Sequence, residues 1–410
     1  MTSVPGARRY AAWQALVGTW FWLPVFFLYF TGELGLDGAL VLEAVYYLAV
    51  VVTEVPSGYA SDRLGRKPTL VLASLFLLAA YIAFFVGGSL ALLVVGQVFL
   101  ALGISFRSGT DTSYHFELLS AAGHQAEFAK REGRLVRLTL LVGAFGAVAG
   151  GLAGSLWLAA AYLLSIVASL VAVGLALGLV PVPVGESSAS PASQLRACWR
   201  ALSQPGVSPG PPLRWLFAVA VLAVVLAHVP YQLYQPYLDA VTWGDLDLPT
   251  ALVSGGHAAA AMLVAAPVAV WSVTAVSRFG TRTTLLVGLI LQWGVIGLLA
   301  VAVHPVIAGL LVLRGAPGAL LRPALDAAVA PQLSAAVRAT YLSLQSLGGR
   351  LAYAVVLALM SLVVGDASSA DGVQVLASLA LGAGAVALVV LASTGRGGQH
   401  RGDPPEESRS

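Results

Sequence analysis

Long hydrophobic runs, separated by short polar breaks, recur along the whole chain. A helix needs about 20 such residues to cross the hydrocarbon core of a membrane, so the pattern predicts twelve membrane-spanning helices. In the first half we expect spans at 12–31, 38–60, 69–88, 90–118, 135–155 and 157–181. In the second half we expect spans at 213–239, 250–276, 284–303, 306–328, 339–364 and 372–394. The pattern therefore predicts an all-α integral membrane protein.

One polar break is longer than the others and divides the spans into two sets of six. Residues 182–212 are rich in Pro, Ser and Gly, which is typical of a linker. We therefore expect an N-terminal six-helix bundle over 1–181, a cytoplasmic linker over 182–212 and a C-terminal six-helix bundle over 213–394. The last stretch, 395–410, is polar and is expected to be a disordered cytoplasmic tail.

The two sets of spans repeat each other at an offset of 215 residues. At this offset SDRLGRKPTLVL, from Ser61, aligns with VSRFGTRTTLLV, from Val276. Two further pairs, inside spans 4 and 10, obey the same offset: Arg107 with Arg322, and Asp111 with Asp326. Separate matches at one offset indicate a duplication, so we expect two pseudo-repeated six-helix bundles.

Composition and charge support a membrane protein and set its orientation. Charged residues make up 10% of the 410 residues, against roughly 25% in an average soluble domain. Lys and Arg gather in alternate loops, which is the bias of cytoplasmic loops in membrane proteins. We therefore expect a multi-pass protein of the plasma (inner) membrane with both termini cytoplasmic. The net charge of +3 reflects the basic residues of these loops, so it gives no reason to expect a nucleic-acid partner. The expected partner is the lipid bilayer.

The loop between spans 2 and 3 carries the most specific motif in the chain. Its fixed positions are Gly58, Asp62, Arg63, Gly65, Arg66 and Lys67. All six match the signature of the major facilitator superfamily, which the chain resembles over nearly its whole length. The resemblance implies the fold of that superfamily and a secondary active transporter that moves a small-molecule substrate by alternating access. It implies no cofactor, and an oligomer is not required.

The resemblance also implies a gate at the cytoplasmic ends of the helices. In the superfamily the motif Asp lies at the start of span 11, which here assigns Asp62 to that helix end. The later Arg pairs with an acid at the inner end of span 4, which here gives Arg66 with Glu117. The alternative is a positive-inside loop with no gating role. The second copy has Ser277 and Thr281 at two signature positions, so a matching gate in the other half is in doubt.

Charged residues inside the spans predict which helices line a cavity, because charge within a membrane is costly. Spans 3, 6, 9 and 12 contain no Asp, Glu, Lys, Arg or His, and we expect them to be peripheral. The cavity candidates on the other spans are Glu43, Tyr47, His228, Gln232, Arg314 and Arg350.

Two carboxyl groups are candidates for carrying a proton that drives transport. Glu54 lies on the same helical face as Glu43 and has no basic residue one turn away, so it is the first candidate. Asp111 is the second candidate, because Arg107 lies one turn before it and would keep its carboxyl group ionised. The alternatives are structural: Glu54 as a neutral acid bonded to a neighbouring helix, and Arg107–Asp111 as an ion pair that only eases insertion.

No nucleotide-binding motif or paired metal ligands appear, so we expect neither an enzyme nor a metal site. Small residues over 143–151 resemble the tail of the superfamily's antiporter motif, with Ala147 in place of its proline, and favour efflux of a drug-like or amphipathic compound. The alternative is ordinary close packing of helices through small residues. One alternative is a proton-coupled symporter for a nutrient or organic anion, with Arg314 and Arg350 as an anion clamp. Another is a non-transporting sensor, for which a sizeable soluble appendage would be expected.

Overall fold

The computed structural model describes residues 4–182, 196, 199–200, 211–244, 248–333, 335–365 and 369–394. Over these ranges the chain is almost entirely helical and contains no strand. The expected linker and tail, 182–212 and 395–410, lie almost wholly outside the described residues. The prediction of an all-α membrane fold is confirmed.

The helices fall into two sets that follow the predicted halves of the sequence. The first set is α1 (Ala7–Val17), α2 (Phe26–Leu64), α3 (Arg66–Val86), α4 (Leu90–Arg107), α5 (Thr110–Ala121), η1 (Gln125–Glu127), α6 (Phe128–Leu156) and α7 (Ala160–Leu177). The second set is α9 (Leu213–Ala240), α10 (Thr250–Phe279), α11 (Thr281–Val301), α12 (Pro305–Leu310), η2 (Leu311–Gly315), α13 (Ala316–Val329), η3 (Ala330–Gln332), α14 (Ala335–Val364) and α15 (Ser369–Thr394).

Eleven helical segments within the described ranges are long and apolar enough to cross a membrane. The first expected span, 12–31, differs from a continuous helix. It is interrupted between Val17 and Phe26, where Trp20 has a φ of 41° and Pro24 removes a backbone donor. Helix α2 then contains the end of this span and all of the next, because Gly35 kinks the chain with a φ of 75°. The expected span 90–118 is also broken, at Ser108–Gly109.

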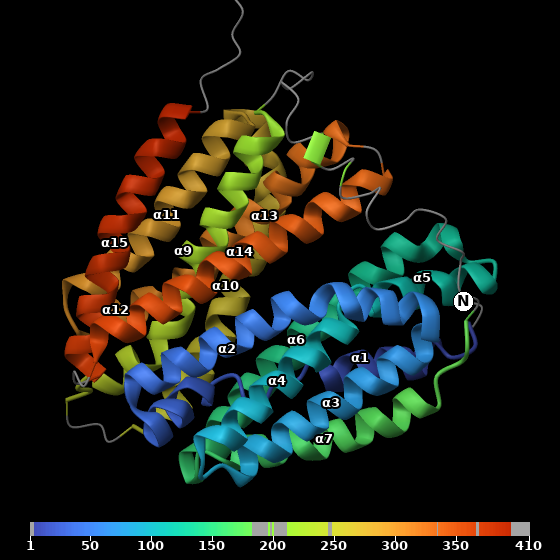
Figure 1. Cartoon of the computed structure of the whole chain (residues 1–410), viewed down its shortest axis with the longest axis horizontal. Helices are drawn as coiled ribbons and strands as arrows, with labels where there is room; N and C mark the ends of the chain where they lie inside the picture. Colours follow the sequence, from blue (N-terminus) through green and yellow to red (C-terminus); the bar gives the residue numbers. More distant parts are fainter. Residues whose placement is uncertain are drawn as a thin grey trace, which may run out of the picture.

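The two sets of helices form two bundles that separate towards one end of the molecule (Figure 1). Helix α2 packs against α14, and α6 packs against α10, across the boundary between the bundles. Helices α3, α7, α11 and α15 make their helix contacts inside their own bundles, as the peripheral positions of spans 3, 6, 9 and 12 predict. We call the end where Gly65 joins α2 to α3 the motif end, and the opposite end the far end.

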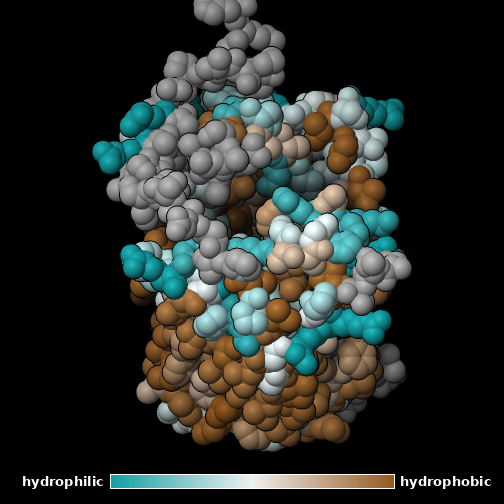
Figure 2. All heavy atoms as spheres, turned by 90° about the vertical axis from the view of Figure 1, so that its right-hand side faces the viewer, coloured by the Kyte–Doolittle hydropathy of each residue, from teal (hydrophilic) through white to brown (hydrophobic). Residues whose placement is uncertain are grey.

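The outer surfaces suit a lipid environment. Large apolar side chains are exposed on them, including Leu156, Leu362 and Val270 at 88%, 82% and 78%. Figure 2 faces the motif end and shows hydrophilic residues gathered there, with hydrophobic flanks beside them. Apolar patches of this extent indicate contact with lipid, because water would penalise them.

Candidate functional site

A cavity of about 490 Å³ lies between the two bundles. Both bundles contribute to its wall. The wall contains ten aromatic residues: Trp20, Trp22, Phe26, Phe30, Tyr46, Tyr47, Phe84, Tyr162, Tyr231 and Tyr234. Five of the six cavity candidates from the sequence line it, namely Glu43, Tyr47, His228, Arg314 and Arg350. The sixth, Gln232, is buried in α9 at 1% exposure but does not line the cavity.

The interrupted stretch between α1 and α2 forms part of the cavity wall. Trp20 and Trp22 line the cavity from it, and Trp22 Nε1 donates to the Tyr81 hydroxyl at 3.0 Å. The backbone of this stretch lies directly against α6, because a Cβ placed on Gly146 or Gly150 would overlap a carbonyl oxygen there. Only glycine allows a backbone to approach a helix so closely.

The far half of the bundle interface is closed by one glutamine from α9. Oε1 of Gln235 accepts hydrogen bonds from the backbone N–H groups of Phe27 and Leu28, at 3.0 and 3.1 Å. Its Nε2 donates to the carbonyl of Leu23 at 2.8 Å. A helix that restarts inside a membrane has unpaired N–H groups in its first turn, and these need partners. Gln235 supplies them from the opposite bundle.

Two glycines complete this closure. A Cβ on Gly151 of α6 would lie 3.0 Å from the Cα of Gly255 on α10, and one on Gly255 would lie 3.0 Å from the Cα of Gly151. The two helices therefore touch through their backbones. Such small-residue contacts allow close helix packing in membranes.

Glu43 is a buried acid on the N-terminal side of the cavity. Its exposure is 5%, and Gln97 Nε2 donates to its Oε1 at 2.8 Å. Tyr47, one turn later on α2, meets two rings of the other bundle edge-on: His228 at 5.5 Å and Tyr353 at 4.9 Å between ring centroids. This face of α2 therefore provides both a carboxyl group and a direct contact to the second bundle.

Glu54 forms an ion pair across the bundle boundary. Arg350 Nη1 of α14 donates to Glu54 Oε2 at 2.5 Å, and both side chains are about three-quarters buried or more. Among the described residues, this is the one recorded ion pair that joins the two bundles. Glu54 lacks a basic partner in its own helix, as the sequence indicates, but the other bundle provides one.

At the motif end, Arg66 bridges two acids of the N-terminal bundle. Its Nε donates to Glu117 Oε1 at 3.1 Å, and its Nη1 donates to Asp62 Oδ1 at 2.7 Å. The Ser61 hydroxyl also accepts from Nη1, at 2.8 Å. Gly65, with a φ of 94°, turns the chain so that Arg66 begins α3. Arg66 and Glu117 are therefore in contact, as the resemblance implies.

The family model of the Major Facilitator Superfamily matches residues 11–292. The chain belongs to the major facilitator superfamily. It is accordingly a membrane transporter of this type and not an enzyme.

Similar proteins agree with membership in the superfamily. Sugar transport protein 2 of Arabidopsis thaliana is 36% identical over 75 residues, which are 18% of this chain and 15% of that protein. The solved nucleoside transporter NupG has a TM-score of 0.75 at 13% identity, covering 94% of this chain and 97% of that one. The peptide transporter POT in complex with sulfate has a TM-score of 0.72 at 16% identity, covering 95% and 94%. At these identities the two structures show the fold alone.

Some motif residues lie differently from what the superfamily implies. Asp62 binds Arg66 of its own bundle, and no contact with the start of α14 is recorded among the described residues. Gly58 makes no close helix contact, because a Cβ there would have no neighbour within 4 Å. Arg63 lies over the Tyr59 ring, 5.1 Å from its centroid. Both differences follow from the separation of the bundles at the motif end.

Among the described residues, the second copy of the motif in this superfamily member shows no comparable charge cluster. Arg282, which aligns with Lys67, donates to the carbonyl of Ala392 at 2.8 Å. Arg322 and Asp326, the counterparts of Arg107 and Asp111, are both exposed, and no ion pair between them is recorded.

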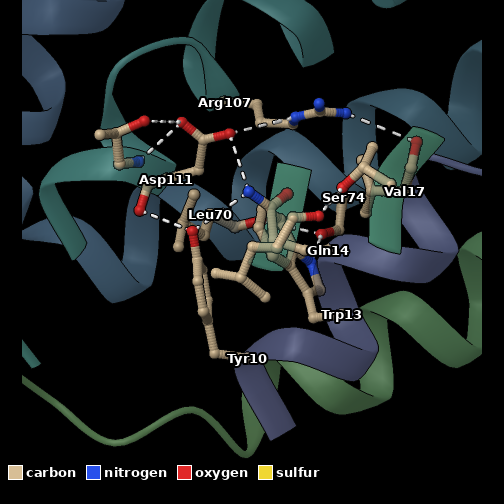
Figure 3. Close-up of polar contacts among 11 residues, drawn as sticks. Tyr10, Trp13, Gln14, Val17, Leu70, Ser74, Arg107 and Asp111 are labelled. Carbon is tan, nitrogen blue, oxygen red and sulfur yellow. Dashed lines mark hydrogen bonds and ion pairs between the residues drawn. The ribbon is translucent and has the colours of Figure 1, made fainter. Parts of the chain in front are cut away.

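Asp111 lies inside the N-terminal bundle and does not line the cavity (Figure 3). Its Oδ2 accepts from Arg107 Nε at 3.4 Å and from Gln14 Nε2 at 3.2 Å. The Tyr10 hydroxyl donates to its carbonyl at 2.8 Å. These contacts join α1, α4 and α5 where the fourth span is broken, so the structural interpretation of the Arg107–Asp111 pair fits this geometry.

Proposed function

We propose that this chain is a proton-coupled secondary transporter that carries a small solute by alternating access. Coupling occurs at the Glu54–Arg350 ion pair. The proposal rests chiefly on the position of this pair, which joins the bundles beside the cavity while the motif end is open. The observed state has the motif end open and the far end closed, which is one of the two states that alternating access requires.

Protonation of Glu54 would change the balance between these two states. A carboxylate attracts the Arg350 guanidinium strongly, whereas a neutral carboxyl group does not. The ionised pair therefore stabilises the state in which it is observed, and a proton removes that stabilisation. Since a ligand shifts an equilibrium only by its different affinity for the two states, proton binding favours the state with the motif end closed.

Orientation follows from the basic residues of the motif end. Positive charge marks the cytoplasmic side, so we place the motif end in the cytoplasm and the protein in the plasma (inner) membrane. The open cavity is then accessible from the cytoplasm. The glycines that resemble an antiporter tail pack against the interrupted first span and α10, which accounts for them without selecting export or uptake. Efflux therefore stays a prediction from the sequence, to be measured in both directions.

Spin labels can test the coupling step without a known solute. Cys198 is the one cysteine of the chain, so Cys198→Ser with Gln125→Cys and Ser277→Cys places a label on each bundle at exposed sites of the motif end. We expect acid pH to shift the measured distances to shorter values. Glu54→Gln should give the shorter distances at every pH. Asp326→Asn, an exposed carboxyl group on α13, is the matched control and should behave as the wild type.

Transport itself is tested in proteoliposomes with an imposed pH gradient. A solute is first identified by counterflow exchange from a compound library, in both orientations of the gradient. Glu54→Gln should keep exchange and lose gradient-driven accumulation. Undiminished accumulation in Glu54→Gln excludes this residue as the coupling site. A wild type that ignores the gradient excludes proton coupling altogether, and a protein that exchanges no solute favours the sensor alternative.

A further inference from the structure

Arg314 is a partly buried cation that faces the cavity from the tenth span. It lies in η2, the 3-10 segment that separates α12 from α13, and it lines the cavity between the bundles. Its guanidinium lies over the Tyr234 ring, 3.9 Å from the centroid. A charged side chain within a membrane span is costly, so such residues usually have an acidic partner or a function.

The protein partners of Arg314 are all neutral. Its Nη1 donates to Nδ1 of His257 at 2.6 Å and to the carbonyl of Leu311 at 3.3 Å. Nδ1 therefore carries no proton, and Nε2 of His257 donates to the carbonyl of Ala308 at 3.0 Å. The imidazole of His257 is therefore neutral, with Nδ1 as the acceptor and Nε2 as the protonated donor. His257 orients the guanidinium but does not neutralise it.

The other charged groups of the cavity are held elsewhere. Arg350, with which Arg314 was expected to form an anion clamp, is bound by Glu54. Glu43 is bound by Gln97 on the opposite side, in the N-terminal bundle. Among the described residues, no acidic side chain is therefore recorded within ion-pair distance of Arg314.

The surroundings of Arg314 hold it in place before any solute arrives. The Tyr234 hydroxyl accepts from Gln235 Nε2 at 3.1 Å and from Ser254 Oγ at 3.3 Å, which fixes the ring under the guanidinium. A guanidinium has five donors in a planar fork that matches a carboxylate or another oxyanion. Aromatic side chains, including Tyr231 and Phe26, form the adjoining apolar wall.

We infer that the solute is a small organic anion, whose carboxylate or similar oxyanion binds Arg314 while its apolar part lies against the aromatic wall. This inference rests on the proposed function, since it names the substrate class of the same cavity. It does not depend on proton coupling, because anion binding requires no gradient. It favours the organic-anion alternative over a cationic or neutral amphipathic solute.

Acid and amide pairs of equal shape provide the test on the full-length protein in nanodiscs at pH 7. The pairs are benzoate and benzamide, 2-naphthoate and 2-naphthamide, and hexanoate and hexanamide. Binding is measured by the shift in Tm and by the fluorescence of Trp20 and Trp22, which line the cavity. We expect at least one acid to bind about tenfold more tightly than its amide. If no acid exceeds its amide, the inference is wrong.

Variants of Arg314 separate binding from structure. Arg314→Gln should abolish the preference for the acid, Arg314→Lys should keep part of it, and Arg322→Gln, an exposed arginine of α13, should keep all of it. Without any ligand, Arg314→Gln should be as stable as the wild type or more stable, because a charge with no recorded acidic partner among the described residues is removed. A preference that survives Arg314→Gln overturns the inference. A ligand-free Tm well below that of Arg322→Gln also overturns it, because Arg314 would then be structural.

Discussion

The two ends of this transporter are built from different chemistry. The far end is closed by neutral groups: the amide of Gln235 on three backbone groups, and the contact of Gly151 with Gly255. The motif end is open and carries charges, with Arg66 bound to two acids of its own bundle. Neutral contacts of this kind act only at short range and require a matching shape. Charges at a water-exposed end can exchange partners at small cost.

The difference follows from the solvent of each region. Backbone groups inside a membrane must be paired, so an interrupted helix there requires a partner of fixed geometry. Ion pairs exposed to water contribute only about 0–1 kcal/mol each. Asp62, at 50% side-chain exposure, is the more exposed partner of Arg66, so this contact can break during a transport cycle. The far closure should therefore depend on shape, and the motif end should depend on pH and salt.

The largest expected effect is that of bulk at the far contact. Gly151→Leu places a side chain between two helix backbones, and overpacking of this kind typically costs about 1–3 kcal/mol. We expect the variant to lose the observed state and nearly all transport. The distance between labels at Gln125 and Ser277 measures the loss, because the motif end should close as the far end is forced apart.

Gly58→Leu is the matched control, because it makes the same substitution at the motif end. A Cβ at Gly58 has open space around it, so the substitution fits the observed state. It should leave the Tm unchanged and keep the motif end open, because close approach of the bundles is then blocked. If both variants shift the label distance in the same direction, glycine contacts do not distinguish the two ends.

The next largest effect is expected at Gln235. Gln235→Ala removes three hydrogen bonds to backbone groups and a fourth to the Tyr234 hydroxyl, and a net hydrogen bond contributes about 0.5–1.5 kcal/mol. We expect the closed far end to be destabilised by about 1–3 kcal/mol, with two N–H groups left unpaired. Gln235→Glu keeps an acceptor and should fall between alanine and wild type. Hydrogen exchange at Phe27 and Leu28 measures the loss, and unchanged protection there would contradict the role of Gln235.

Hydrophobic patterning was sufficient to predict an all-α membrane protein, and the motif resemblance its superfamily, but neither predicted the breaks inside the spans. Charges inside the spans indicated the helices that face a cavity, and Glu43, Arg314 and Arg350 line the cavity between the bundles. The sequence did not predict the break before Phe26, although Pro24 lies within the expected span. The backbone groups that the break leaves unpaired find their partner in the other bundle, which the local pattern does not show. Gln235 was missed for the same reason: its partner is a stretch of backbone, which has no signature in a side-chain pattern.

Long-range partners were equally hidden from the sequence. Spacing along α2 correctly gives Glu54 no local basic partner, but Arg350 is 296 residues away and pairs with it only because the two bundles meet. In a continuous fourth span Asp111 would lie on the same helical face as Arg107. The turn at Gly109, with a φ of 74°, instead directs Asp111 into its own bundle. Phe84 and Tyr162 reach the cavity from peripheral helices, since large side chains extend beyond their own helix positions.

The smallest expected effect concerns pH at the motif end, where Glu127 lies in the turn η1. His124 Nδ1 lies 2.8 Å from Glu127 Oε1, and Arg131 Nε donates to Oε2 at 3.0 Å. The hydrogen bond with His124, followed by that from Arg131, lowers the pKa of Glu127 below its ordinary value of about 4.3. The cluster is exposed, so its contribution to stability is small.

The sign of the pH effect follows from that lowered pKa. An acid whose folded pKa lies below its unfolded pKa stabilises the protein fully at neutral pH, and the stabilisation is lost as the pH falls through the folded value. Glu127→Gln should therefore lower the Tm by about 2 °C or less at pH 7, and the difference should disappear well below pH 4. Glu33→Gln, an exposed acid of the far half, is the control and should show no such dependence. A constant difference between Glu127→Gln and wild type from pH 7 to pH 3 would mean that the charge of Glu127 does not stabilise the motif end, and the contrast between a charged end and a neutral end would then rest on Arg66 alone.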